Sequence, residues 1–350
     1  MSLNFHTMHD KNPDIVASLA RLHEHHFGAR PTVITGLQGD GSDRQIFRLS
    51  SDANEPVIGI YGPNRRENEA FISFSRALHQ HAIPVPIIYT YDADAHIYLE
   101  SDLGDVTLLE WSNQHDDSSS VLTMYRQVIS WLPKVQLTSK DSIDYTKCHP
   151  FAAFRREAMQ FDLDYFQSSF LSRFLRIRLD NAALANDFNL LIAHLLRAPF
   201  DAFMYRDFQS KNIMICNEQP FFIDYQSGRK GALQYDVASL LFDANVNLSH
   251  SFREAMLEFY IRETMRYIPI QEKKFLTFYY DFALLRMLQA LAAFSFLVFQ
   301  KGKSYFMKSI PNALQNIAFL LTQDDCMLRR LPELRRLFEE DVLNNPQALS

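Results

Sequence analysis

The feature that most restricts the fold of this chain is a set of three polar residues placed among short apolar runs. Asp207 and Asn212 lie five residues apart, and Asp224 follows twelve residues after Asn212. The apolar stretches on either side of both acids predict short strands joined by tight loops. Such loops can bring the three side chains to one point. A polar hairpin with incidental acids is the alternative interpretation.

These residue types suit the transfer of a phosphoryl group. The reaction needs an acceptor hydroxyl aimed in line and cations that neutralise the phosphates. The Asp207 carboxylate can orient a hydroxyl and accept its proton, so we predict a catalytic role for it. Hard Mg²⁺ prefers oxygen ligands, usually together with phosphate oxygens and waters. Asn212 and Asp224 are therefore the predicted metal ligands.

The predicted elements run from strand-rich to helical, as in a kinase fold. We expect a small β-rich N-terminal lobe, a hinge and a larger, mainly helical C-terminal lobe, which is an α+β fold. The expected strands of the first lobe cover residues 32–35, 45–49, 57–60 and 97–100, with a helix over 64–80. The expected helices of the second lobe cover 108–112, 121–137, 151–179, 182–196, most of the chain after 234 and a terminal segment near 331–343, around a β island at 202–205, 213–216 and 221–223.

Composition excludes several other classes of protein. With 350 residues, 47% hydrophobic content and a net charge of −6, the chain is globular, and its charge argues against a nucleic-acid binder. Three distant cysteines without zinc spacing indicate reduced thiols and a cytoplasmic protein. The apolar run 282–299 approaches membrane-spanning length, but Arg286 and Gln289 interrupt it. We therefore expect a buried helix and no membrane partner.

Two stretches carry a resemblance to a known family. Residues 205–214 with Asp224 resemble the catalytic loop and metal-binding aspartate of the aminoglycoside phosphotransferase and choline kinase group. Residues 223–241 are similar to the IDFQDA…GP..YDL.SLL signature of a bacterial branch that includes anomeric N-acetylmuramate/N-acetylglucosamine kinases. The resemblance spans residues 36–311. It implies a protein kinase-like fold, ATP and Mg²⁺ as cofactors, and a structural role for Asp236, which braces the catalytic loop in relatives.

A turn of small residues over 36–49 is the predicted nucleotide flap. Backbone N–H groups in such a turn can cover phosphates, although turns of this type are common. Its position about 165 residues before the Asp207 loop, and its resemblance to the branch's S.a..R.YfR stretch, give it this role. The predicted nucleotide-binding residues of the flap are Gly39, Gly41, Ser42, Arg44 and Arg48.

The hinge is expected at residues 98–105, which resemble an LLeDLGd stretch of the same branch. Glu100, Asp102 and Leu103 are accordingly assigned to the nucleotide site, and a strand end with an acidic turn is the alternative. The hinge divides the chain into a nucleotide-binding lobe, residues 1–103, and a lobe with the catalytic loop and acceptor site, residues 104–350.

The chain departs from the kinase pattern in two places. The strand 57–61 lacks the lysine that usually holds the phosphates, so Arg44, Arg48 or Lys211 is expected to supply that charge. Tyr205 replaces the usual histidine of the catalytic loop, and we expect little chemical consequence. The cluster of His23, His25 and His26 is interpreted as a solvated helix face.

Three functions remain open at the level of sequence. The first is a kinase for a small acceptor, an amino sugar phosphorylated at the anomeric position, with a functional link to a sugar-1-phosphate nucleotidyltransferase. The second is a kinase for an aminoglycoside or amino alcohol, although no dense acidic stretch awaits a polycation. The third is a weakly active nucleotide-binding regulatory protein. Retention of Asp207, Asn212 and Asp224 together argues against the third.

Overall fold

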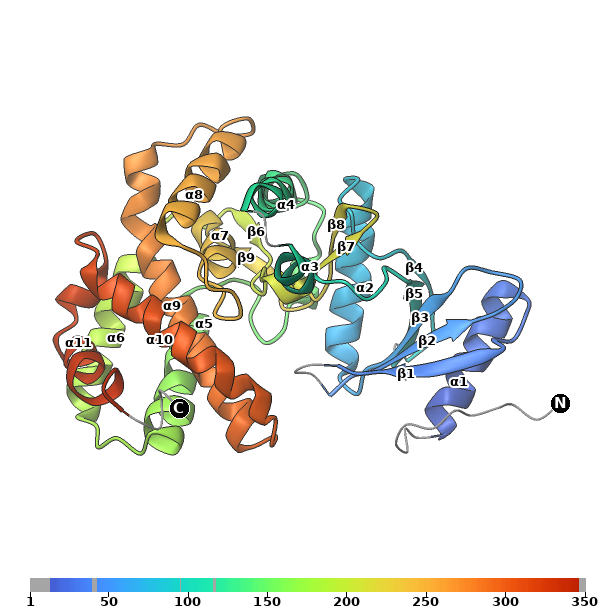
Figure 1. Cartoon of the computed structure of the whole chain (residues 1–350), viewed down its shortest axis with the longest axis horizontal. Coiled ribbons are helices and arrows are strands. Elements are labelled where there is room, and N and C mark those ends of the chain that lie inside the picture. Colours follow the sequence, from blue (N-terminus) through green and yellow to red (C-terminus); the bar gives the residue numbers. More distant parts are fainter. Residues whose placement is uncertain (1–12, 40–42, 95, 116–117, 346–350) are drawn as a thin grey trace.

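The computed structural model describes residues 13–39, 43–94, 96–115 and 118–345, which form two lobes (Figure 1). The smaller lobe holds a five-stranded antiparallel sheet of order β1-β2-β3-β5-β4. Its elements are α1 (Pro13–Phe27), β1 (Val33–Leu37), β2 (Gln45–Ser50), β3 (Val57–Tyr61), α2 (Arg65–Gln80), β4 (Ile88–Tyr91) and β5 (Ile97–Ser101).

The two faces of this sheet are both apolar, because successive side chains of a strand point in opposite directions. On one face, Val57 and Leu99 pack with Leu19 of α1 in a small separate core. On the other face, Ile58 and Tyr98 join α2 and the main core of the protein. The sheet is therefore held between α1 and the inner face of α2, and α2 links it to the larger lobe.

The larger lobe is mainly helical and contains two small hairpin-like sheets. Strand β6 pairs with β9, and β7 pairs with β8, all antiparallel. The elements are α3 (Leu108–Gln114), α4 (Ser118–Thr138), α5 (Arg156–Tyr165), α6 (Asn181–Leu195), β6 (Ala202–Met204), β7 (Ile213–Cys216), β8 (Gln219–Phe222), β9 (Arg229–Gly231), α7 (Leu233–Leu241), α8 (His250–Thr264), α9 (Glu272–Phe299), α10 (Ser309–Thr322) and α11 (Pro332–Arg336).

Helix α9 lies at the centre of the larger lobe. By length and composition it could cross a membrane, but 67% of the residues in its most apolar window are buried inside the structure. Arg286, in the middle of the helix, is also buried and donates to the Ser239 hydroxyl of α7. The expected burial of this apolar run is confirmed. Of its two polar interruptions, Arg286 bonds to α7, and Gln289 accepts from Arg286 within the helix.

The expected two-lobed α+β fold is confirmed, with corrections in four places. Strands β4 and β9 were not among the expected strands, since four and three residues carry too little pattern. The helix expected over 151–179 is shorter, because α5 passes into a π-helical segment, Phe166–Phe174. The expectation of a solvated face is wrong for His23, which is fully buried, and the Nδ1 atom of His23 lies 2.8 Å from the Ala29 carbonyl oxygen.

Candidate active site

The catalytic loop is anchored to the protein by one buried carboxylate. Asp236, in the first turn of α7, accepts backbone N–H groups from Tyr205 and Arg206, both at 2.9 Å. The Gln136 amide donates to the same carboxylate at 2.8 Å. Arg206 has a φ of 77°, a left-handed conformation that a non-glycine residue adopts only when its surroundings stabilise it. The two bonds from Asp236 fix the backbone at this strained turn, directly before Asp207.

Asp207 follows this turn and reaches two side chains of the same site. The Ser227 hydroxyl donates to its Oδ2 at 2.6 Å, and the Arg286 guanidinium lies 3.9 Å from its Oδ1. The Asp207 side chain is 26% exposed, so its carboxylate remains accessible. A carboxylate that accepts a hydrogen bond from the Ser227 hydroxyl can accept one from the hydroxyl of a bound substrate in the same way.

Asn212 and Asp224 are brought together beside Asp207. The Asn212 amide nitrogen donates to the Asp207 backbone oxygen at 2.9 Å and lies 3.4 Å from Asp224 Oδ2. Asp224 also has a left-handed φ, 67°, and accepts from the Gln226 amide at 2.6 Å. Burial of its carboxyl raises the pKa of Asp224. The positive charge of Arg44 lowers this pKa, and the negative charge of Asp207 raises it, so the net shift is upward. The side chain is still 40% exposed.

The fit of this pair to a magnesium ion can be judged from its donor atoms. The amide nitrogen of Asn212 makes the bonds to protein, which leaves its oxygen for another ligand. One amide oxygen and one carboxylate are an ordinary protein contribution to Mg²⁺ when phosphates and waters complete the shell. No cluster of three or more His, Cys, Asp or Glu side chains in the described ranges could hold a metal by itself. The residues fit a cation that arrives with a nucleotide.

Arg44 lies beside the predicted metal ligand Asp224, whereas the strand that usually carries the phosphate-binding lysine has none. Its guanidinium lies 3.5 Å from Asp224 and 5.8 Å from the centre of the Phe71 ring, and its side chain is only 9% exposed. Burial alone would lower the pKa of the Arg44 guanidinium. Nearby Tyr98 and acids raise this pKa by a larger amount, so it lies above its ordinary value. The structure thus brings a permanent cation beside the predicted metal ligand.

Arg48, the other flap arginine, lies at the hinge instead. It forms a two-bond ion pair with Asp102, one bond of 3.0 Å, and a second pair with Asp105 at 2.8 Å. Leu103 is half-buried between these acids, and Gly104 takes a φ of 83° while donating its N–H to Asp102. Arg48 therefore ties β2 to the connection between the lobes, and its contact with phosphates stays a prediction.

Glu100 lies on β5 directly before this hinge and is 7% exposed. Its Oε2 atom has no hydrogen-bond partner among the described residues. Burial raises the pKa of Glu100 to about 8, with Arg44 acting against the shift. The carboxyl is thus neutral at pH 7 unless a ligand changes its surroundings.

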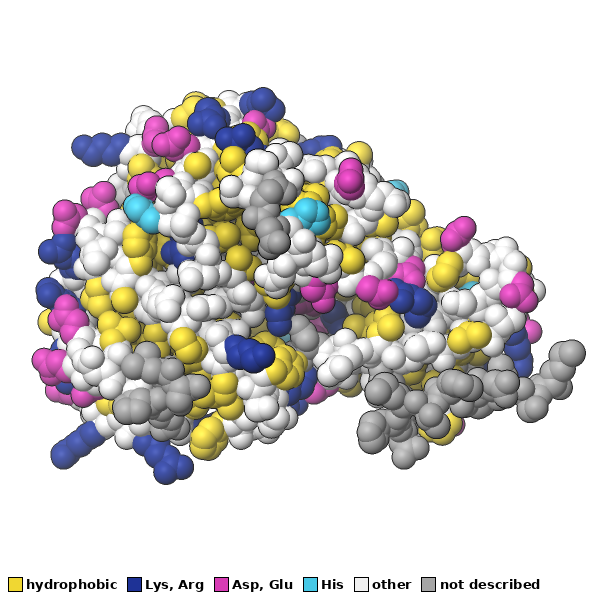
Figure 2. Space-filling view, in the orientation of Figure 1, with side chains coloured by type: hydrophobic (Ala, Val, Ile, Leu, Met, Phe, Trp, Pro, Cys, Tyr) yellow, Lys and Arg dark blue, Asp and Glu magenta, His cyan; other side chains and the backbone are white. Residues whose placement is uncertain are grey.

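The remaining predicted contacts are spread over the mouth of the cleft. Gly39 is half-buried at the end of β1, whereas Gly41 and Ser42 lie outside the described residues. Lys211 sits near the Phe306 ring, 5.2 Å from its centre. Lys301 pairs with Asp43 at 2.9 Å and so links the flap to the larger lobe. The space-filling view shows the surface indented between the two lobes (Figure 2).

Sequence reasoning missed two side chains that organise the site, Ser227 and Gln226, and named Tyr205 without foreseeing its hydrogen bond. Ser227 and Gln226 hold Asp207 and Asp224, respectively. The Tyr205 hydroxyl donates to the Ile223 carbonyl, which ties the catalytic loop to the residue before Asp224. Only their position in the motif-bearing segments could have drawn attention to them, because hydroxyls and amides carry no spacing signal of their own.

Comparison with known proteins agrees with this geometry. The model of the phosphotransferase enzyme family matches residues 33–269, more than half of the chain. The chain belongs to this family. Membership makes it a small-molecule kinase, and ATP is the donor that such kinases use.

Three curated relatives have a more specific name than the family as a whole. The chain is 22% identical to the N-acetylmuramate/N-acetylglucosamine kinase of Neisseria meningitidis over 80% of this chain and 83% of the relative. It is 24% identical to the protein of that name from Pseudomonas aeruginosa, over 88% of each chain. The protein of the same name from Pseudomonas putida is 23% identical, over 87% of this chain and 86% of the relative.

Solved structures share the fold at low identity. A Plasmodium vivax ethanolamine kinase superposes with a TM-score of 0.62 at 12% identity, covering 89% of this chain and 92% of that one. An amicoumacin kinase in complex with AMP-PNP, Ca²⁺ and Ami gives a TM-score of 0.60 at 11% identity, covering 95% and 94%. These similarities establish the two-lobed kinase fold.

The position of Arg44 predicts that it, rather than Arg48, supplies the missing phosphate-binding charge. Arg44→Ala should raise the Michaelis constant for ATP, or lower turnover, by more than about tenfold, which is about 1.4 kcal/mol. Arg48→Ala should have a smaller effect on these constants than Arg44→Ala, because the Arg48 guanidinium is paired with Asp102 and Asp105 at the hinge. Steady-state kinetics with ATP as the varied substrate measure both. Equal effects, or a larger loss in the Arg48 variant, would contradict the assignment.

The buried Glu100 predicts a pH-dependent stability. An acid whose pKa is raised to about 8 on folding stabilises the protein below its ordinary pKa, and that contribution is lost as pH rises toward 8. Glu100→Gln mimics the neutral form, so its free energy of unfolding should gain on that of the parent between about pH 5 and 8. The gain is at most about 1.4 kcal/mol per pH unit. Urea unfolding at three pH values measures it, and a constant difference would disprove the neutral carboxyl.

Proposed function

We propose that the protein transfers the γ-phosphoryl group of ATP to the anomeric hydroxyl of an N-acetylated amino sugar, with Mg²⁺. The convergence of Asp207, Asn212 and Asp224 in one cleft is the observation that carries the reaction type. The acceptor rests on the curated relatives, which are named N-acetylmuramate/N-acetylglucosamine kinases and align over most of both chains.

The proposed role of Asp207 follows from its hydrogen bonds. A carboxylate that accepts the Ser227 hydroxyl at 2.6 Å can accept an acceptor hydroxyl in the same way. It would aim that oxygen at the γ-phosphorus and take its proton as the new O–P bond forms and the bond to ADP breaks. The Asp236 brace keeps the loop in place while this happens, and Ser227 fixes the carboxylate plane.

The phosphates are proposed to lie between the flap and the Asn212–Asp224 pair. Mg²⁺ bound there would neutralise phosphate charge, and Arg44, 3.5 Å from Asp224, would add a fixed positive charge from the opposite lobe. Gly39, Gly41 and Ser42 would offer backbone N–H groups, and residues 100–103 would border the adenine. Lys211 would be the next source of charge if Arg44 proved dispensable.

The proposed product indicates which class of enzyme would use it next. A sugar 1-phosphate is an activated precursor for enzymes that form nucleotide sugars, so a sugar-1-phosphate nucleotidyltransferase is the proposed consumer. Such chemistry, together with the three free cysteines, fits a protein of the cytoplasm.

The proposal predicts a specific loss in an Asp207→Asn variant. The amide keeps the shape of the side chain but removes the proton acceptor, so sugar-dependent turnover should fall by about 10² to 10⁴. An assay of ADP release with Mg-ATP and N-acetylglucosamine measures turnover, and thermal unfolding with Mg-ATP measures nucleotide binding, which should be retained.

Two controls sharpen this experiment. Glu258→Gln, which changes an exposed carboxylate on α8, should keep parental turnover. A panel of amino alcohols and aminoglycosides tests the identity of the acceptor independently of the role of Asp207. Turnover of Asp207→Asn within about threefold of the parent would remove Asp207 from the chemistry. If an amino alcohol or aminoglycoside is phosphorylated while N-acetylglucosamine and N-acetylmuramate are both inert, the protein is a kinase but its acceptor is not an amino sugar.

A further inference from the structure

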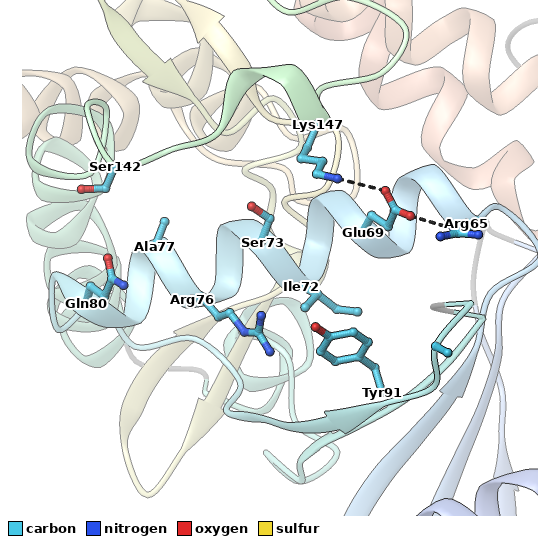
Figure 3. A pocket seen from close by; sticks show the side chains of 11 residues that line it. Arg65, Glu69, Ile72, Ser73, Arg76, Ala77, Gln80, Tyr91, Ser142 and Lys147 are labelled. Atoms are coloured by element: carbon cyan, nitrogen blue, oxygen red, sulfur yellow. Dashed lines mark hydrogen bonds and ion pairs between the residues drawn. The ribbon is translucent and has the colours of Figure 1, made fainter.

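A second cavity lies on the outer face of α2, away from the cleft described above (Figure 3). Its volume is about 480 Å³, within the range of small-molecule sites. Residues spaced along one face of α2 form its floor, with the buried Ile72 and Ala77 supplying an apolar surface. Tyr91 of β4 and Lys147 of the turn Tyr145–Lys147 form opposite walls (Figure 3).

The lining of this cavity is positively charged, although the whole chain carries a net charge of −6. Arg65, Arg76 and Lys147 all reach it, against the single carboxylate of Glu69. Glu69 is shared, 2.7 Å from Arg65 and 3.2 Å from Lys147. Asp94 at the rim lies 3.6 Å from Arg65 and reduces that charge further.

Arg76 is the most available of the three cations. It has no ion-pair partner within the described parts of the chain, and its guanidinium lies 5.1 Å from the centre of the exposed Tyr91 ring. The ring and the guanidinium together offer an aromatic surface next to a positive charge. Lys147 faces them from the larger lobe and can swing from Glu69 toward an anion.

The cavity is connected to the active site through α2. The inner face of the same helix carries Phe71, whose ring stacks on Tyr225 with 4.8 Å between centres. Ser75, one turn further, hydrogen-bonds the Tyr225 hydroxyl at 2.6 Å. Tyr225 directly follows Asp224. A ligand that joins Arg76 of α2 to Lys147 of the larger lobe therefore acts on the helix that positions the predicted metal ligand.

We propose that this cavity, hereafter the α2 pocket, binds a small organic phosphate monoester and that its occupancy alters the use of ATP. A phosphate monoester carries about 1.5 to 2 negative charges at pH 7, which matches the excess of cations over Glu69. Its organic part would lie on Ile72, Ala77 and the Tyr91 ring. A singly charged carboxylate would match only one of the two positive charges in excess over Glu69, and a purely apolar ligand would match neither.

Calorimetric titration of the full chain with glucose 6-phosphate tests the proposal, with Mg-ADP in excess so that the cleft is filled. Binding should persist in Mg-ADP. An Arg76→Ala/Lys147→Ala double variant should bind at least about tenfold more weakly, because two charge-assisted contacts are lost. Arg66→Ala, on the same helix but outside the pocket, is the matched control and should bind like the parent. Glucose should not bind.

Each other result counts against the proposal. Loss of binding when Mg-ADP is present would place the sugar phosphate in the cleft, and equal binding by the double variant would place it elsewhere on the surface. No binding of glucose 6-phosphate would remove the site. Inorganic phosphate that binds as tightly as glucose 6-phosphate would reduce it to simple ion pairing.

The coupling has its own measurement. In the parent and in Arg66→Ala, saturating glucose 6-phosphate should change the Michaelis constant for ATP by about fivefold or more, and in the double variant it should not. Binding without any change in ATP kinetics would overturn the coupling through α2. By linkage, the same coupling should appear in the affinity for Mg-ATP measured calorimetrically without an acceptor, so this readout does not depend on which acceptor the kinase uses.

Discussion

The site depends on the hydrogen bonds between the buried Asp236 carboxylate and the backbone N–H groups of Tyr205 and Arg206. They hold Arg206 in a left-handed conformation that its side chain alone would not favour. The buried Arg206 side chain is stabilised in turn by Asp162, 2.9 Å away. With this turn fixed, Asp207 and Asn212 project toward Asp224. Without it, the spacing that brings the three together has no rigid support.

The structure depends, secondly, on the contacts that join the two lobes. Arg48 ties β2 to the hinge acids, and Arg44 reaches from the flap to Asp224 in the larger lobe. The Lys301–Asp43 pair adds a further contact between the flap and the larger lobe. Because these contacts cross between lobes, the same side chains that complete the site also set how the lobes sit. Helix α2 also contacts this region, because Phe71 stacks on the Tyr225 ring and Ser75 hydrogen-bonds the Tyr225 hydroxyl.

Much of this was readable from the sequence because it is local. Short β-rich runs bounded by turn residues predicted the strands β1, β2, β3 and β5. The spacing of Asp207, Asn212 and Asp224 predicted their convergence. What the sequence could not yield depends on distant partners. His23 looked solvated beside two other histidines, yet tertiary packing buries it. Arg44 and Arg48 were equivalent in the sequence, and only the fold separates a cleft position from a hinge position. The α2 pocket likewise needs Lys147, which lies far from α2 along the chain.

The central claim is that this cleft phosphorylates an N-acetylated amino sugar on its anomeric oxygen. Proton-coupled phosphorus NMR of the product from N-acetylglucosamine and Mg-ATP tests it most directly. The account predicts a phosphate monoester signal split into a doublet by the single anomeric proton, and lost on mild acid treatment. An acid-stable product whose phosphorus couples to a methylene pair, as on the primary hydroxyl, would contradict it.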